Sequence, residues 1–282
     1  MLIESPVSEL QLAILLPEVE RIARKAGELI MQVYVRDFEV MIKEDKSPVT
    51  EADLLASAYI ESELKKLAPE IPFLSEESAI APFSVRSTWH SYWLVDPLDG
   101  TRSFVKKEGE FTVNIALIHQ HNAVLGVVYD PITSINYYAA KDVGAFKRDP
   151  EGNVDNLVAK PLGELPVITG NRSRTGTMQR FLKKVGRHKL IEMSSSLKIC
   201  LVAEGRADLY ARFWPTSEWD TAAGHAIIDE AGGRLVDIEM QPLLYNMKDS
   251  LLNPHFFVMG NHQRDWSQDV SYRGEEKSNN GK

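Results

Sequence analysis

The 282-residue sequence has little cysteine and no long apolar run, and each shortage excludes a class of protein. Cys200 is the only cysteine, so no internal disulfide can hold the fold, and a reducing compartment such as the cytoplasm is expected. No apolar run reaches the roughly 18 residues of a membrane-spanning helix, so no transmembrane segment is predicted. The start of the chain carries an early Glu4 and no basic stretch, which does not fit a secretory signal.

The sequence also lacks an excess of positive charge. Its 40 acidic residues outnumber its 32 basic ones, and the net charge is −8. Non-specific nucleic-acid binding needs a basic surface that displaces counterions from phosphates, so nucleic acid is not an expected partner. The composition, 44% hydrophobic and 26% charged, is typical of a soluble globular protein with one large domain or two smaller ones. An acidic excess becomes informative where carboxylates cluster, because clustered carboxylates need cations.

Apolar spacing in the first half predicts two helices followed by strands. Apolar residues at three- and four-residue steps predict a helix over 7–35, with Pro17 in its first turn and a short separate turn before it. Thr50, with Asp53 three residues on, resembles a capping box and predicts a helix from there to about Ala68. Strands are predicted at 71–75, 91–96, 111–120, 123–130 and 135–140, the last three as an antiparallel meander.

A polar stretch at 147–160 is the best boundary between an N-terminal half, 1–160, and a C-terminal half, 161–270. In the second half, strands are predicted at 167–169, 207–213, 234–238 and 256–259, and helices at 177–185, at 196–204 and from Trp219-Asp220 to Gly232-Gly233. The polar tail, 271–282, is predicted to be disordered. The pattern indicates an α+β first half and an α/β second half.

The most informative motif is Asp96-Pro97-Leu98-Asp99-Gly100-Thr101. An apolar strand brings Asp96 to the edge of a sheet, and Pro97 forces an extended turn that returns Asp99 beside it. Two carboxylates so close repel each other unless a cation lies between them. Oxygen ligands with no Cys or His nearby favour Mg²⁺ over Zn²⁺, and the turn at Gly100-Thr101 exposes N–H groups suited to a phosphate. A surface turn is the alternative, since Asp-Pro and Asp-Gly are common in turns.

Two further acidic sites lie where apolar segments end. Glu76-Glu77 follows a predicted strand and Asp220 follows Trp219, and each alone is also typical of a helix start. Together with Asp53 and the Asp96–Thr101 motif, and with Gly232-Gly233 downstream, they resemble in order the pattern of the inositol monophosphatase superfamily. These proteins are lithium-sensitive, magnesium-dependent phosphomonoesterases. The resemblance extends over about 10–260 of the chain.

The resemblance implies a layered αβαβα sandwich whose active site lies between a metal-binding N-terminal half and a substrate-binding C-terminal half. It implies two or three Mg²⁺ ions, with Li⁺ inhibiting by replacing one of them. The implied ligands are Glu76, Asp96, the carbonyl of Leu98, Asp99 and Asp220, with Asp96 bridging two ions. Thr101 and Asp53 would orient the attacking water, with Glu76 nearby, and no phosphoenzyme forms. Two metals suit this slow reaction because they activate water and neutralise phosphate oxygens.

The second half resembles the 3′(2′),5′-bisphosphate nucleotidases, in particular the bacterial form tied to sulfate assimilation. The resemblance is carried by 195–205, 207–213, 215–224 and Leu252-Asn253-Pro254. It implies a substrate site formed by Gly100, Thr101, Ser195, Lys198, Arg212 and Asp220. Lys198 and Arg212 would hold the phosphate that is not on the metals, as a point charge and a bidentate fork. Each could instead be structural, Lys198 as a solvated helix lysine and Arg212 as a partner of Asp208 or Glu218.

Two positions depart from this subgroup. Ser194 and Trp214 stand where glycine is usual, and the indole either stacks on a base or narrows the pocket. The predicted reaction is hydrolysis of 3′-phosphoadenosine 5′-phosphate to AMP and phosphate by a cytoplasmic enzyme. An inositol-1-phosphate phosphatase is the alternative within the superfamily. A non-catalytic metal-binding regulator is a third reading, disfavoured by the presence of both Thr101 and Asp53. A homodimer and a peripheral association with the inner face of the membrane stay open.

Overall fold

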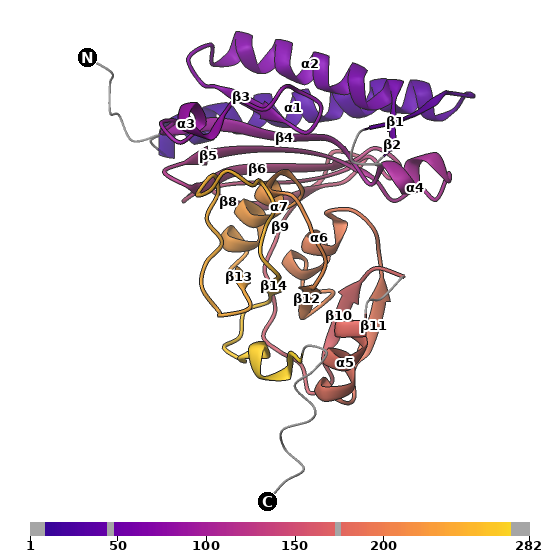
Figure 1. Cartoon of the computed structure of the whole chain (residues 1–282), viewed down its shortest axis with the longest axis vertical. Coiled ribbons are helices and arrows are strands. Elements are labelled where there is room, and N and C mark those ends of the chain that lie inside the picture. Colours follow the sequence, from indigo (N-terminus) through magenta and orange to yellow (C-terminus); the bar gives the residue numbers. More distant parts are fainter. Residues whose placement is uncertain (1–8, 44–47, 173–175, 272–282) are drawn as a thin grey trace, which may run out of the picture.

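The computed structural model describes residues 9–43, 48–172 and 176–271 (Figure 1). The helices are α1 (Glu9–Tyr34), α2 (Glu51–Leu67), α3 (Phe83–Arg86), α4 (Thr101–Val105), α5 (Gly176–Val185), α6 (Leu197–Ala203) and α7 (Glu218–Glu230), with a 3-10 helix at Trp266–Asp269. The strands of the first half are β1 (Val40–Ile42), β2 (Pro48–Thr50), β3 (Phe73–Ser75), β4 (Ser91–Asp99), β5 (Thr112–His119), β6 (Asn122–Asp130), β7 (Ile135–Ala140), β8 (Gly144–Arg148) and β9 (Val154–Asn156). Those of the second half are β10 (Val167–Gly170), β11 (Lys189–Glu192), β12 (Leu209–Arg212), β13 (Arg234–Asp237) and β14 (Phe256–Met259).

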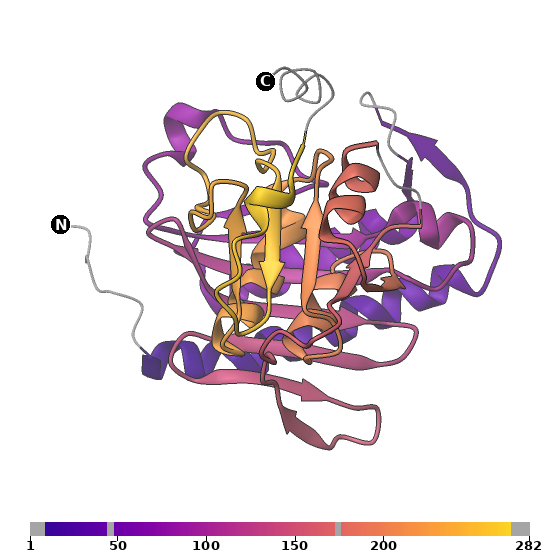
Figure 2. The ribbon, with the colours of Figure 1, turned by 90° about the horizontal axis from the view of Figure 1, so that it is seen from below.

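Five layers alternate between helices and sheets. Helices α1 and α2 cover one face of a seven-stranded sheet, and α6 and α7 lie between that sheet and a five-stranded one (Figures 1 and 2). Helix α5 and Trp266 pack on the outer face of the smaller sheet. Successive residues of β4 point to opposite faces, so that Trp93 packs toward α1 and α2 while Leu94 packs toward α6 and α7. The predicted αβαβα sandwich is confirmed.

The larger sheet has the strand order β3-β4-β5-β6-β7-β8-β9. Its strands are antiparallel neighbours except for β3 and β4, which run parallel. The predicted meander is therefore confirmed, and two further strands extend into the polar stretch 147–160. Residues up to Arg148 belong to β8, and β9 is a fully exposed edge strand whose backbone pairs with β8. Backbone pairing of this kind needs no apolar pattern, so the polar composition concealed two strands.

The smaller sheet has the strand order β11-β10-β12-β14-β13. Strands β10, β11 and β12 are parallel, and β14 is antiparallel to both of its neighbours. Strand β11 was not predicted, because it is a short edge strand without a buried residue. The chain passes from one sheet to the other between Asn156 and Val167. The division into halves at residue 160 stays a prediction, since one apolar core joins side chains of both sheets.

Helix α1 continues through Pro17, so the prediction that Pro17 sits in a first turn after a separate segment was wrong. Proline removes one backbone hydrogen bond from a helix interior, at a cost of about 3 kcal/mol or more. Leu12 and Leu16 before it and Val19 after it are all buried in the same core. Burial on both sides of the proline therefore holds the helix together where its local sequence disfavours it.

Ser271, the first residue of the predicted disordered tail, is the last residue that the structure describes. It is buried, and its carbonyl oxygen accepts a hydrogen bond from Arg180 Nε at 3.0 Å, so the prediction was wrong for this residue. The rest of the predicted tail lies outside the described part of the chain. Among the described helices, none combines the length and the apolar character needed to cross a membrane.

The central position of α7 depends on a glycine in β6. A Cβ atom on Gly126 would lie 2.1 Å from the carbonyl oxygen of Ala223 in α7. No side chain can fit there, so the helix backbone rests directly on the sheet. Because Asp220 lies in the first turn of α7, this contact also determines how deep that carboxylate sits in the molecule.

We expect Gly126→Ala to lower the free energy of unfolding by about 1–3 kcal/mol, because the added methyl group must push α7 away from β6. Urea unfolding followed by circular dichroism measures the change. Gly163→Ala is the matched control, since its Cβ would meet only the Leu165 carbonyl oxygen, at 3.9 Å. Equal stability of the two variants would contradict the role assigned to Gly126.

Candidate active site between the two sheets

A pocket of about 880 Å³ opens between the two halves. The predicted metal ligands and substrate-binding residues all line it: Glu76, Asp96, Leu98, Asp99, Gly100, Thr101, Ser195, Lys198, Arg212 and Asp220. Asp53 is the one predicted site residue that does not line the pocket. It accepts a hydrogen bond from Thr101, which does line the pocket. Residues separated by more than a hundred positions in the sequence therefore meet in one cavity.

Three carboxylates form the centre of the pocket. Side-chain oxygens of Glu76, Asp96 and Asp220 lie within 4.8 Å of one another. Strands β3 and β4 are parallel, so their carboxyl ends place Glu76 and Asp96 at the same edge of the sheet. The predicted end of the strand at Asp96 was wrong: β4 continues to Asp99, and a shift in its pairing with β5 between Asp96 and Asp99 replaces the predicted turn at Pro97. Such a cluster of hard oxygen donors is suited to a divalent cation.

Burial and mutual repulsion make these carboxylates hard to ionise. The pKa of Asp96 is raised well above its ordinary value, first by burial and then by the charges of Glu76, Asp99 and Asp220. The pKa of Asp220 is raised to about 8 by burial, with Asp99 and Glu76 adding to the effect. Burial likewise raises the pKa of Glu76, against the opposing charge of Lys43. A cation among these groups would remove the repulsion that keeps them protonated.

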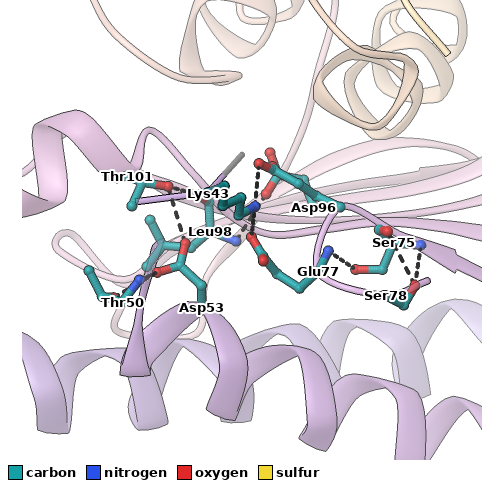
Figure 3. Close-up of polar contacts among 10 residues, drawn as sticks. Lys43, Thr50, Asp53, Ser75, Glu77, Ser78, Asp96, Leu98 and Thr101 are labelled. Carbon is teal, nitrogen blue, oxygen red and sulfur yellow. Dashed lines mark hydrogen bonds and ion pairs between the residues drawn. The ribbon is translucent and has the colours of Figure 1, made fainter. Parts of the chain in front are cut away.

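Lys43 is a cation that the sequence analysis did not identify. It follows β1, and its Nζ lies 2.9 Å from Oε1 of Glu76 and 2.5 Å from Oε1 of Glu77. Figure 3 shows the lysine reaching the acidic cluster from the side of Leu98. Lys43 lies in a stretch with no distinctive motif, so the sequence carried no signal for it.

Asp53 is positioned by the start of α2. It is the third residue of the helix and the last residue of the predicted capping box, which is confirmed: Asp53 Oδ2 accepts hydrogen bonds from the backbone N–H of Thr50 at 2.7 Å and from its hydroxyl at 2.6 Å. The other oxygen, Oδ1, accepts a bond from Thr101 Oγ1 at 3.1 Å (Figure 3). Burial raises the pKa of Asp53, and the bonds from Thr50 and Thr101 oppose that rise. The carboxylate therefore has one oxygen committed to the fold and one directed at Thr101.

The hydroxyl of Thr101 has two acceptors within reach. Its Oγ1 lies 3.1 Å from Asp53 and 3.2 Å from the carbonyl oxygen of Leu98, and one proton can serve only one of them. When it points to Asp53, the Leu98 carbonyl is available to a cation, and the lone pairs of Thr101 can accept a hydrogen bond from a water. Gly100 allows this turn, because its φ is +95° and a Cβ there would lie 2.8 Å from the carbonyl oxygen of Glu110.

Ser196 is the second residue that the sequence analysis missed. Its Oγ lies 2.8 Å from Asp99 Oδ2 and 2.8 Å from the carbonyl oxygen of Asp220, and it accepts a bond from Asn114 Nδ2 at 2.8 Å. This hydroxyl thus links β5, the end of β4 and the start of α7. Its place in the run Ser194-Ser195-Ser196, directly before a helix, was the available signal.

The C-terminal half adds Lys198 and Arg212 to the lining of the pocket, to which the N-terminal half contributes Arg102 and Lys106. Lys198 is buried, so the alternative of a solvated helix lysine was wrong. Its Nζ donates to the Ser195 carbonyl oxygen at 2.5 Å, and burial lowers its pKa to about 8. Ser195 itself adopts a φ of +53°, which turns that carbonyl toward the lysine at the start of α6. Tyr210 lies beneath the lysine, with its ring centre 5.3 Å from Nζ.

Arg212 holds the loop that follows β12. It donates to the carbonyl oxygens of Trp214 and Pro215, each at 3.2 Å, and to Thr216 Oγ1 at 2.6 Å. Within the described part of the chain it forms no ion pair with Asp208 or Glu218, so the structure gives that alternative no support.

The carboxylate cluster predicts an unusual response to pH in metal-free protein. A raised pKa means that a carboxyl group contributes its stability when protonated, below about pH 4, and loses it as the pH rises through the folded-state value, about 8 for Asp220. We therefore expect the urea midpoint of wild-type protein in EDTA to fall between about pH 5 and 8. Added Mg²⁺ should restore much of the lost stability, because the cation offsets the repulsion between the carboxylates.

Asp96→Asn should reverse the effect of the acidic cluster on the stability of the metal-free protein. Without Mg²⁺ near pH 8 the variant should be more stable than wild type by about 1–3 kcal/mol, and added Mg²⁺ should stabilise it much less. Asp155→Asn on the exposed strand β9 is the control and should behave as wild type. A metal-free Asp96→Asn protein less stable than wild type would contradict the repulsion argument.

Comparison with known proteins agrees with this geometry. Residues 14–268 match the family model described as the inositol monophosphatase family. A 3′(2′),5′-bisphosphate nucleotidase CysQ of Salmonella typhimurium is 48% identical over 247 residues, covering 86% of this chain and 99% of that protein. The CysQ of Escherichia coli is 45% identical over the same length and shares of the chains.

Solved structures show the same fold. The crystal structure of CysQ from Bacteroides thetaiotaomicron, a bacterial member of the inositol monophosphatase family, matches with a TM-score of 0.77 and 38% identity, over 88% of this chain and 97% of that one. An IMPase of Thermotoga maritima matches with a TM-score of 0.72 and 26% identity, over 89% and 92% of the two chains. The sandwich, the acidic pocket and these matches together establish that this chain belongs to the inositol monophosphatase family.

Proposed function

We propose that this protein is a Mg²⁺-dependent 3′(2′),5′-bisphosphate nucleotidase that releases the 3′-phosphate of 3′-phosphoadenosine 5′-phosphate. The observation that carries the proposal is that one pocket brings together the carboxylates Glu76, Asp96 and Asp220, which lie within 4.8 Å of one another, and the cations Lys198 and Arg212. A substrate with two phosphates fits such a site, because one phosphate can be bound through metal ions and the other by the cations. The nucleotidase relatives support the same substrate class.

The chemistry of the donors fits Mg²⁺. Its ligands would be the carboxylates of Glu76, Asp96, Asp99 and Asp220 and the carbonyl oxygen of Leu98. When bound, the metal lowers the pKa of a water and neutralises phosphate oxygens. We further propose that Li⁺ inhibits by taking the place of one Mg²⁺.

Two hydrogen-bonded groups would handle the attacking water. Thr101 Oγ1 lines the pocket, and when it donates to Asp53 its lone pairs can accept a hydrogen bond from a water. Asp53 is fixed by Thr50 and cannot turn away without breaking the capping box of α2. This pair therefore orients the water, and Asp53 is placed to take up its proton through the hydroxyl of Thr101.

The two alternative functions would each leave part of the pocket without a role. An inositol-1-phosphate phosphatase would act on a single phosphate, and the buried Lys198 would then have no anionic partner in the substrate. A non-catalytic metal-binding regulator would not need the bond between Thr101 and Asp53. A cytoplasmic location is compatible with the single buried thiol of Cys200. A homodimer and a peripheral association with the membrane remain expectations.

A variant of Thr101 tests the water-orienting pair. Thr101→Ala should lower kcat by about 100-fold or more, because general acid–base positioning contributes roughly 10²–10⁴-fold, whereas Thr101→Ser should keep most of the activity. Phosphate release with saturating Mg²⁺ measures kcat. Mg²⁺-induced stabilisation against urea is the control and should persist in both variants. A fully active alanine variant would remove Thr101 from the mechanism.

Substrate choice can be tested with Lys198→Ala and Arg212→Ala. Loss of a charge-assisted contact of about 1.5–3 kcal/mol should lower kcat/KM for 3′-phosphoadenosine 5′-phosphate by roughly 10- to 100-fold. Hydrolysis of a monophosphate substrate should change far less. The assay is phosphate release over a panel that includes inositol 1-phosphate, with and without Mg²⁺ and Li⁺. A wild-type preference for inositol 1-phosphate, or a parallel loss on both substrates, would favour the inositol phosphatase.

A further inference from the structure

The lining of the pocket includes an aromatic residue, Trp214, whose side chain is largely exposed. Of the five tryptophans, Trp93 and Trp266 are fully buried, Trp89 and Trp219 are partly buried, and Trp214 is 62% exposed. Within the described part of the chain, the indole of Trp214 has no ring contact or cation–π contact. An exposed aromatic side chain in the lining of a pocket offers an apolar surface that a ligand can cover.

The backbone holds Trp214 in place while its side chain remains uncovered. The Trp214 carbonyl oxygen accepts hydrogen bonds from Arg212 Nε at 3.2 Å and from Thr216 Oγ1 at 3.1 Å. Arg212 also donates to the next carbonyl, that of Pro215. A loop tied by these bonds loses little conformational freedom when a ligand contacts it, so the indole is prearranged for binding.

The position of Arg212 indicates which part of the substrate lies near the indole of Trp214. In a nucleoside 3′,5′-bisphosphate, both phosphates and the base are attached to one ribose ring. If Arg212 binds the phosphate that is not on the metals, the ribose that carries this phosphate lies beside the guanidinium. The base is then separated from the guanidinium by no more than the width of that ribose. Trp214 is the exposed aromatic residue whose backbone carbonyl oxygen accepts a hydrogen bond from Arg212. The pocket wall there adds Phe213 and Phe256, which makes this end less polar than the carboxylate end.

We infer that Trp214 is a specificity-determining residue whose indole stacks on the base of the nucleotide substrate. The inference rests on the proposed function and extends it from the phosphates to the base. Stacking on an aromatic side chain is tolerant of base identity, because every base presents a flat π face. Trp214 therefore selects nucleotides over sugar phosphates that have no base, and discriminates only weakly among the bases.

The test compares a substrate with its base and one without it. Wild-type protein should show a KM for 3′-phosphoadenosine 5′-phosphate about 5- to 100-fold below that for ribose 3,5-bisphosphate, the range expected from one stacked base. Trp214→Ala should raise the KM for the nucleotide by a similar factor, and should leave its kcat and the KM for ribose 3,5-bisphosphate within about twofold. Trp214→Phe should keep much of the preference. Val158→Ala, at a similarly exposed residue outside the pocket, should change nothing.

A second readout does not depend on turnover. Because Trp214 is the one exposed indole, it should dominate quenching of tryptophan fluorescence by acrylamide. AMP should protect wild-type protein from this quenching and should have no such effect on Trp214→Ala.

Two results would overturn the inference and leave the proposed function standing. One is an unchanged nucleotide KM in Trp214→Ala. The other is an equal rise in KM for both substrates, which would show that the residue acts only through the loop bound to Arg212. Wild-type protein that does not hydrolyse 3′-phosphoadenosine 5′-phosphate would overturn the proposed function, and this inference with it.

Discussion

Repulsion between buried carboxylates is the constraint on which the rest of the site depends. Glu76, Asp96 and Asp220 come from three different elements and meet within 4.8 Å. Each has a raised pKa because it is buried beside like charges. This repulsion lowers the free energy of unfolding, and packing in three apolar clusters that extend over both sheets offsets it. Cations bound among the carboxylates would remove the repulsion and raise the free energy of unfolding again.

The same structural device positions an acid in each half of the molecule. Asp53 and Asp220 are both the third residue of a helix, and both close a capping box with the residue before the helix, Thr50 in one case and Ser217 in the other. One oxygen of each carboxylate is thereby fixed by the backbone: Ser217 N–H bonds to Asp220 Oδ2 at 2.9 Å. Helix starts so constrained hold carboxylates more rigidly than surface loops can.

Both halves of the chain contribute to the pocket. Glu76 follows β3, Asp96 lies in β4 and Thr101 begins α4, while α6 and β12 supply Lys198 and Arg212. Ser196 joins the two sets, because its hydroxyl contacts both Asp99 and the backbone of Asp220. Substitutions of Lys198 or Arg212 leave the side chains of the acidic cluster unchanged, whereas Asp220 and Ser196 connect the second half of the chain to that cluster.

The sequence by itself predicted the α+β and α/β halves and the capping box at Thr50 from local spacing. The order of its motifs resembles that of a known family, and this resemblance predicted the layered sandwich and the residues that line the acidic pocket. Only the tertiary structure decided the path of α1 through Pro17, the two polar strands β8 and β9, and the contacts of Lys43 and Ser196. Burial on both sides overrides a proline, and backbone pairing needs no apolar pattern. Contacts between distant residues leave no local trace in a sequence, since they arise only when separate elements pack together.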